Sequence, residues 1–425
     1  MTPLLRAGIA GLGLLGLIAL TGCAGGDPAA GLVRAEGVTA RVVPVPDAAA
    51  LPAVVDATRR VGTATLALAP RDANSVVSPS SLMMALAMLT EGARGDTLTA
   101  LDQLFGATGE DRRDAVAALR GALLALDGDP AAATGKELPE RPIIHLANQV
   151  VLDDQYQASE DFLKALADVF DAGVQRADLA SDAGKQVLSD WVSHHTGGLI
   201  PETAIEPNPD LRLVLQDAIL LAAAWQTPFE SALTADRQFT LPDGSEVYAE
   251  SMYAMKQFAY AEVDGWRAVR LPYVEALHSD VLLPPAGTDP ADATPELLAK
   301  VSTALDAAAG QLVNLTLPTL DIGPDKLDLL DILPAVGAPV LCQDAPDLSG
   351  MGPGDLCVLQ AVQQTVLKVD EAGTVAAAVT EIGVGETSAP MPDQDLAFDR
   401  PFLFTVSHTE TGWPLFLAAV RDPRH

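Results

Sequence analysis

The chain has 425 residues, of which 49% are hydrophobic and 20% are charged, and its formal net charge at pH 7 is −31. That composition is typical of a globular protein long enough for one large core or two modest ones. So large an acidic excess repels phosphate backbones, which argues against nucleic acid as a partner and against electrostatic docking on anionic membranes. We interpret the charge as a source of solubility.

The first 22 residues have the pattern of a targeting segment. Arg6 precedes an uncharged apolar run over residues 7–20, which is short for a bilayer span but suits the core of a signal peptide. The run ends in Leu-Thr-Gly-Cys at residues 20–23, which resembles the bacterial lipoprotein box. The resemblance implies cleavage before Cys23 and a diacylglycerol on its sulfur, so we expect an exported protein held at the cell surface or envelope by lipid alone. A plain signal peptide with a chance cysteine is the alternative.

Two further cysteines, Cys342 and Cys357, lie in the last quarter of the chain. Export would place them where a disulfide can persist, and a bridge that closes such a loop stabilises by about 3 kcal/mol in the chain-entropy model. Spacing does not show whether their Cα atoms are close enough, so the sequence leaves a bridge and two free thiols equally open.

The sequence predicts three parts: a signal peptide over residues 1–22, a flexible tether over residues 23–50, and one domain over residues 51–425. The tether is rich in Ala, Gly and Pro and has no periodicity. In the domain, we expect Ser78 to cap a helix whose first residue is a proline, and whose apolar run is buried on every face.

Other elements follow from hydrophobic periodicity along the chain. Helices are predicted over residues 53–69, 159–170 and 185–195, strands over residues 143–152, 213–224, 312–320 and 356–369, and two strands between residues 402 and 420. Long helices mixed with many non-consecutive strands indicate an α+β domain rather than a doubly wound sheet.

Several separate segments resemble the serpin family, in the family's order. They are residues 78–97, 146–152 with Asn148, 191–200, 219–229, 370–380, 398–404 and 414–417. The resemblance implies the serpin fold: mixed β-sheets with a large central sheet, surrounding helices and an exposed reactive-centre loop. It also implies a suicide inhibitor rather than an enzyme, with no cofactor or metal and with a monomeric chain.

In the family's mechanism, a serine protease attacks the loop and is trapped one-to-one as an acyl-enzyme when the cleaved loop inserts as a central strand. A cysteine protease is a second class of target. Counting as the family does places the scissile bond between Thr387 and Ser388. The small side chain of Thr387 suits an elastase-like or subtilisin-like protease. A slip of one residue would place Glu386 in the specificity pocket and favour a glutamyl-specific protease.

The hinge of this loop has a sequence that can enter a sheet. Between Glu371 and Ala389 there is no proline, so every residue can donate to a strand ladder. Alternation places one uncharged set on a single face: Thr374, Ala376, Ala378, Thr380, Ile382 and Val384. The hinge residues implied by the resemblance are Glu371, Gly373, Thr374, Val375, Ala376, Ala377 and Ala378.

The resemblance also defines a region where the central sheet opens, formed by Ser78, Ser81, Asp217, Trp225 and Gln363. Here the sequence departs from the family, which usually has His at the position of Gln363 and Asn at that of Asp217. Gln363 can donate its amide to Asp217 and so preserve a hydrogen bond with the roles altered.

Two other classes of function remain as alternatives. A non-inhibitory serpin fold that serves as a binding or scaffold protein would favour a charged or proline-bearing hinge, which this chain lacks. A serine hydrolase is disfavoured because Ser78, Ser80 and Ser81 have no Gly-x-Ser-x-Gly elbow. His194 and His195 point about 100° apart on a helix, which disfavours a shared metal ion.

Overall fold

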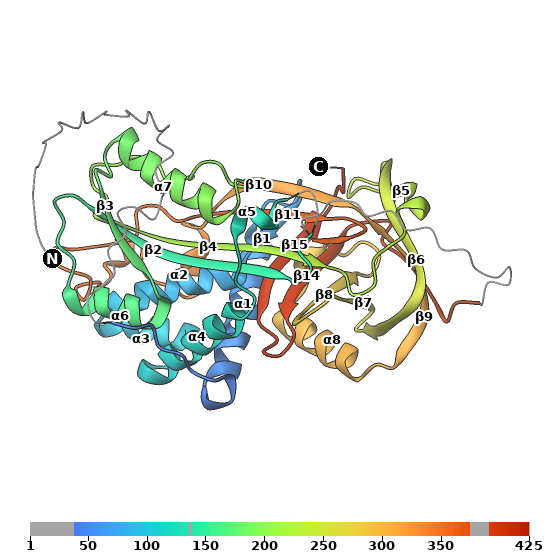
Figure 1. Ribbon diagram of the computed structural model, residues 1–425, viewed down its shortest axis with the longest axis horizontal. Helices are drawn as coiled ribbons and strands as arrows, with labels where there is room; N and C mark the ends of the chain where they lie inside the picture. The colour runs from blue at the N-terminus through green and yellow to red at the C-terminus, as the bar shows by residue number, and fades with distance from the viewer. Residues whose placement is uncertain (1–37, 136–137, 375–390, 425) are drawn as a thin grey trace, which may run out of the picture.

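The computed structural model describes residues 38–135, 138–374 and 391–424, which form two β-sheets surrounded by helices (Figure 1). The smaller sheet has the strand order β10-β11-β12-β4-β2-β3. Its strands are β2 (Ile143–Asp153), β3 (Gly173–Ala177), β4 (Leu213–Ala224), β10 (Leu320–Asp328), β11 (Val362–Val369) and β12 (Gly373–Thr374).

The larger sheet has the order β1-β15-β14-β8-β7-β6-β9-β13, with β5 paired to β6 beside this path. Its strands are β1 (Ser75–Val77), β5 (Ala235–Thr240), β6 (Glu246–Val263), β7 (Trp266–Pro272), β8 (Leu277–Leu283), β9 (Gly310–Pro318), β13 (Gln394–Ala397), β14 (Phe402–His408) and β15 (Pro414–Val420). The predicted closing strands are therefore present. The strand predicted over residues 312–320 corresponds to β9, whereas β5, β6, β7 and β8 were missed, because their apolar residues do not alternate cleanly along the chain.

The described helices are α1 (Leu51–Leu68), α2 (Pro79–Gly92), α3 (Gly95–Phe105), α4 (Gly109–Leu124), α5 (Pro130–Ala133), α6 (Glu160–Phe170), α7 (Asp182–His195), α8 (Pro295–Ala307) and α9 (Ile332–Ala335). None of the helices in the described part of the chain is long and apolar enough to cross a membrane.

Helix α2 begins as the sequence predicts. The side chain of Ser78 accepts a hydrogen bond from the Ser81 N–H, and Pro79 occupies the first helical position. The apolar residues that follow are buried, except that Ala85 is half-buried because it lines a cavity. α2 is therefore a core helix, and it supports the smaller sheet from one side.

Strand β4 shows how the two faces of the smaller sheet are covered. Val214 packs in one core cluster with Leu188 of α7, and the Gln216 amide donates to the Leu188 carbonyl. Successive side chains alternate faces, so the odd-numbered residues of β4 point to the opposite face, where α2 lies. Helices α2 and α7 thus cover opposite faces of the same strand (Figure 1).

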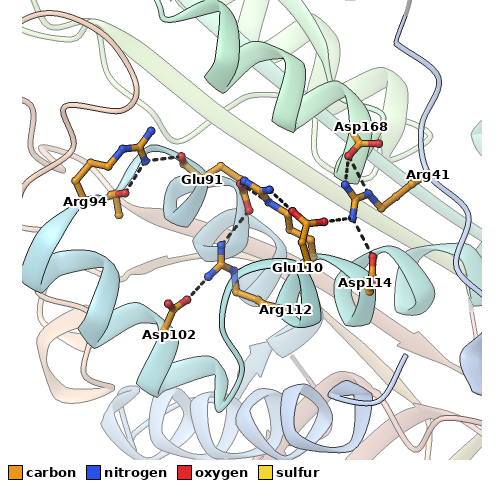
Figure 2. A network of polar contacts seen from close by, with 10 residues as sticks. Arg41, Glu91, Arg94, Asp102, Glu110, Arg112, Asp114 and Asp168 are labelled. Carbon is orange, nitrogen blue, oxygen red and sulfur yellow. Dashed lines mark hydrogen bonds and ion pairs between the residues drawn. The ribbon is translucent and has the colours of Figure 1, made fainter. Parts of the chain in front are cut away.

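Two predicted boundaries need correction. The strand expected over residues 356–369 is limited to Val362–Val369, because the preceding segment contains a disulfide and follows no regular ladder. Packing begins before Leu51, within the predicted tether: Ala48 is buried, and Arg41 forms ion pairs with Glu110, Asp114 and Asp168 (Figure 2). Because this segment is rich in Ala and Pro, its sequence provided no indication that Ala48 is buried or that Arg41 is paired.

Candidate functional site: a gap in the smaller sheet

The smaller sheet contains a gap between β4 and β11. In the described residues these strands pair with each other nowhere, and β12 is the neighbour that they share. β12 supplies only Gly373 and Thr374, which pair with Ala224 and Ala223 of β4. Beyond this pair lies a cavity of about 630 Å³, lined by α2, β4, β11 and the segment before β11.

The edges of this gap are polar backbone and partly uncovered apolar side chains. Leu213, Leu215 and Ile219 of β4 line the cavity and are only half-buried. In a sheet whose other faces are covered, such residues indicate a missing neighbour rather than an outer surface. The gap therefore has the shape and chemistry to receive one more strand.

Trp225 holds the segment that leads into the gap, residues 370–372, at the end of the gap next to β12. The indole Nε1–H of Trp225 donates to the Asp370 carbonyl at 2.9 Å, and its backbone N–H donates to the Ala372 carbonyl at 2.9 Å. Glu371 accepts twice, at its carbonyl from the Phe229 N–H and at its carboxylate from the Thr234 hydroxyl at 2.5 Å. The turn before β12 is thus fixed on both sides.

Gly373 and Thr374 enter the sheet at a crowded point. A Cβ on Gly373 would lie 2.1 Å from the Ala223 carbonyl oxygen, so only glycine allows this close approach. The Thr374 side chain is 2% exposed, and its hydroxyl lies 2.6 Å from the Tyr273 hydroxyl. Tyr273 stacks on Trp225 with ring centroids 4.3 Å apart. Burial raises the pKa of Tyr273, so it stays protonated, and either hydroxyl can donate in this contact.

Gln363 does not bond to Asp217, contrary to the expectation from sequence. Its Oε1 accepts from the Ser78 backbone N–H at 3.0 Å, and its Nε2 donates to the Ser78 carbonyl at 2.8 Å. The Ser78 hydroxyl donates to the Leu415 carbonyl at 2.9 Å. The amide therefore ties β11 to the start of α2, which the sequence could not show because the two lie 285 residues apart.

Asp217 is left without a hydrogen-bond partner among the described residues, and both of its carboxylate oxygens are buried. Burial raises the pKa of Asp217 to about 8. The Ser81 hydroxyl is near enough to oppose this rise, but the two groups do not have the geometry of a hydrogen bond. The fold therefore brings together the sheet-opening residues that the sequence defined, and among them Asp217 has no hydrogen-bond partner in the described residues.

Comparisons with known proteins agree with this geometry. The family model described as Serpin (serine protease inhibitor) matches residues 63–423. The chain belongs to the serpin family. The leukocyte elastase inhibitor of Bos taurus is 28% identical over 365 residues, which cover 82% of this chain and 93% of that protein. The serine protease inhibitor of Cyanea capillata is 28% identical over 362 residues, which cover 82% of this chain and 92% of that protein.

A solved structure confirms the fold of this serpin. The thermophilic serpin tengpin in its native state has a TM-score of 0.76 and 22% sequence identity, with 92% of this chain and 97% of that chain covered. The sequence-based assignments of family and fold are both confirmed.

In this serpin, Cys342 and Cys357 form a disulfide with their Cα atoms 4.9 Å apart. The bridge lies next to an isolated pairing between Leu341 and Val358, and Cys357 lines the cavity. It therefore ties down the segment that leads into β11, at the end of the gap opposite the hinge.

One histidine of the α7 pair, His195, contacts a histidine of β2. His195 lies 2.7 Å from His145 of β2, whose other ring nitrogen lies 2.7 Å from Asp127. Burial is the largest cause that lowers the pKa of His195 to about 3. Within the described ranges, no group of three or more His, Cys, Asp or Glu side chains could hold a metal ion.

Several residues of the serpin expectation lie outside the described residues. They are Cys23, Val375, Ala376, Ala377, Ala378, Thr387 and Ser388. Tyr273, Phe229 and Thr234 hold the hinge and were not expected from the sequence. Their partners lie 101 to 142 residues away along the chain, so no local pattern indicates them.

Proposed function

We propose that this serpin is a suicide inhibitor of elastase-like or subtilisin-like serine proteases, cleaved between Thr387 and Ser388. The observation that carries the proposal is the entry of Gly373 and Thr374 into one end of a gap that the other described residues leave unfilled. The strand that would complete the sheet has already begun, and the rest of the loop follows it directly in the chain.

The register of β12 supports insertion of the segment after Thr374. Thr374 pairs with Ala223 of β4 and with Val369 of β11, both antiparallel. Each further residue would therefore move one position back along both strands, which would place Thr380 between Asp217 and Gln363. The uncharged set that includes Thr380 would face α2, and would cover the half-buried apolar residues of β4.

The free energy of this step is large enough to disable a protease. Residues 375–384 would extend along β4 as far as Leu213, and at roughly 1 kcal/mol per hydrogen bond they contribute on the order of 10 kcal/mol. Burial of apolar side chains adds to this value. A displacement of about 1 Å in catalytic geometry can slow a reaction 10²-fold. A free energy of this size suffices to displace the catalytic groups of the protease and so to stall deacylation.

The protease class follows from the residue before the scissile bond. Thr387 is small and uncharged, so it fits a small specificity pocket and gives a trypsin-like pocket no cation to bind. One relative is named a leukocyte elastase inhibitor, which agrees with this choice. Sequencing the fragment released by elastase or subtilisin tests it, and a cut outside residues 385–389 would contradict it.

Two variants test the insertion step itself. The wild-type protein, mixed with elastase or subtilisin, should give a one-to-one complex that survives SDS. Thr374→Arg should be cleaved without forming that complex, because an unpaired cation would enter the buried site beside Tyr273. Gln238→Arg adds the same charge on the exposed face of β5 and should inhibit like wild type. Equal inhibition by Thr374→Arg would refute the mechanism.

The site of action is part of the proposal. A diacylglycerol on Cys23 would hold the inhibitor at the cell surface or envelope. Labelling with a radioactive fatty acid tests this, with Cys23→Ala as the control. A wild-type protein that takes up no label would exclude the lipid anchor and leave the inhibitory mechanism untouched.

A further inference from the structure

The carboxyl group of Asp217 occupies the gap without any charged neighbour that could balance it. The elements packed around it offer Ser78 and Ser81 from α2, Asn148 from β2 and Gln363 from β11, all of them neutral. The charged residues that also line the cavity are Asp210, Arg212 and Asp355. The only cation among them, Arg212, lies five residues away along the strand, a distance of about 17 Å.

Asn148 gives a second, independent indication of the protonation state. It pairs directly with Asp217 across the β2–β4 ladder, so their side chains share a face and lie close together. The Oδ1 of Asn148 is buried and has no partner among the described residues, as is true of both Asp217 oxygens. Three buried acceptor oxygens thus lie on two paired residues that share a face. A protonated Asp217 can donate to Asn148, whereas an ionised Asp217 cannot.

We propose that Asp217 must be protonated for a strand to fill the gap, so that inhibition by this serpin is coupled to proton uptake at alkaline pH. The inference rests on the proposed function, because it concerns the same insertion step. It assigns to one residue of this chain a regulatory role, and the family's usual residue at this position, a neutral Asn, could not perform it.

The physical reason is the change in surroundings when the gap closes. The cavity of about 630 Å³ lies beside Asp217, and while the gap is open it has room for water that screens the carboxyl charge at short range. The strand that would enter carries no cation on the face toward α2, and its one charge before residue 386, Glu381, falls on the opposite face. Filling the gap would therefore replace the screening water beside Asp217 with protein and return no countercharge.

The existing burial of Asp217 supports this direction. With the gap open, its pKa is already raised to about 8. A filled gap would raise the pKa further, because desolvation disfavours the charged form. Above pH 8 insertion would then take up as much as one proton, and each further pH unit would weaken the insertion equilibrium by up to tenfold.

The experiment compares the melting temperature of loop-cleaved and intact protein. Each protein is cleaved once between residues 375 and 390 by subtilisin and separated from the protease. The gain in Tm on cleavage is measured from pH 6 to pH 9.5 for wild type, Asp217→Asn and Asp210→Asn. Asp210 lines the same cavity but is exposed, so Asp210→Asn controls for the loss of a charge.

We expect the gain in Tm of wild type and Asp210→Asn to shrink above pH 8 by about 2 °C per pH unit. The gain of Asp217→Asn should stay constant. If wild type and Asp217→Asn show the same profile, the inference is wrong and the proposed function stands. If cleavage raises the Tm of no variant at any pH, the proposed function fails and the inference fails with it.

Discussion

The two ends of helix α2 each lie beside a buried carboxylate, and the protein treats these two groups in opposite ways. At the C-terminal end, the Glu91 side chain is 1% exposed and pairs with Arg112 at 3.1 Å (Figure 2). It also pairs with Arg113 at 2.5 Å. At the N-terminal end, Asp217 has no cation beside it and no hydrogen-bond partner in the described chain.

The difference reflects what each end does. Glu91 joins α2 to α4, and Arg112 extends the cluster to Asp102 of α3, so several helices are fixed together. Asp217 lies where the sheet must part to admit a strand. A tightly paired ion there would have to be broken or carried along during insertion, at a cost of several kcal/mol. The closed end is stabilised by its charges, and the opening end is left with a carboxyl group that avoids charge by keeping its proton.

The largest effect should come from the paired end. Glu91→Gln leaves two arginines without their shared buried partner, so the free energy of unfolding should fall by about 3–5 kcal/mol. Urea unfolding at pH 7 measures it. Glu110→Gln is the matched control: Glu110 also pairs with Arg113, but it is 63% exposed, so the loss should stay below about 1 kcal/mol. Equal losses would remove the contrast between buried and exposed carboxylates.

The disulfide stabilises the end of the gap that lies opposite the hinge, and its contribution can be measured. Replacing Cys342 and Cys357 together with serine should lower the free energy of unfolding by about 3 kcal/mol, because the loop between them is no longer closed in the unfolded chain. Denaturant unfolding of the double variant tests this. Reduction of the wild-type protein should give a similar value, and a loss below about 1 kcal/mol from both would contradict it.

At the N-terminal end of α2, replacing the unpaired Asp217 should raise the free energy of unfolding, whereas replacing Glu91 lowers it. The pKa of Asp217 is about 8 in the folded protein and about 4 in an unfolded chain. The folded state therefore holds a proton that the unfolded chain releases, so stability falls as pH rises from 4 to 8. Asp217→Asn should flatten this part of the pH profile. At pH 7.5 it should stabilise the intact protein by about 2 kcal/mol, since the removed penalty is partly offset by a buried amide.

The pH profile of the intact protein therefore separates the two ends. Urea midpoints measured every half unit from pH 4 to pH 8 give the two curves for wild type and Asp217→Asn. A substitution that lowers stability at pH 7.5 would mean that Asp217 has a stabilising partner. The contrast with Glu91 would then disappear.

The smallest effect should come from the edge of the ionic cluster. Arg41→Gln removes ion pairs to Asp114, Glu110 and Asp168 from a guanidinium that is 24% exposed. The expected loss is about 1 kcal/mol, measured by the shift in Tm. Arg424→Gln, which removes a local pair with Asp422 near the C-terminus, should change Tm less. A larger effect for Arg424 would show that residues 38–50 contribute little to the domain.

Sequence reasoning performed well wherever a few neighbouring residues decide the outcome. Ser78 and Pro79 define the start of α2, because a hydroxyl acceptor and a residue that needs no N–H donor suit that position. Strand β4 has the predicted bounds, residues 213–224. The segments that indicated the serpin family also lie within short stretches, and their order along the chain was sufficient for the assignment.

Polar pairing was less accessible from the sequence. Gln363 was expected to bond Asp217, yet it bonds both backbone groups of Ser78 instead. An amide can satisfy either arrangement, and only the position of α2 against β11 decides between them. Two cysteines fifteen residues apart were equally compatible with thiols and with a bridge, until the pairing of Leu341 with Val358 brought them together.

The sequence by itself determined the helix caps, the strand alternation, the family and a hinge without proline or buried charge, because these depend on residue type and local spacing. The tertiary structure decided that Thr374 meets Tyr273, that Glu91 is paired and that Asp217 is not. These outcomes depend on which distant elements pack together. The same carboxyl group is charged or neutral according to the neighbours that packing gives it.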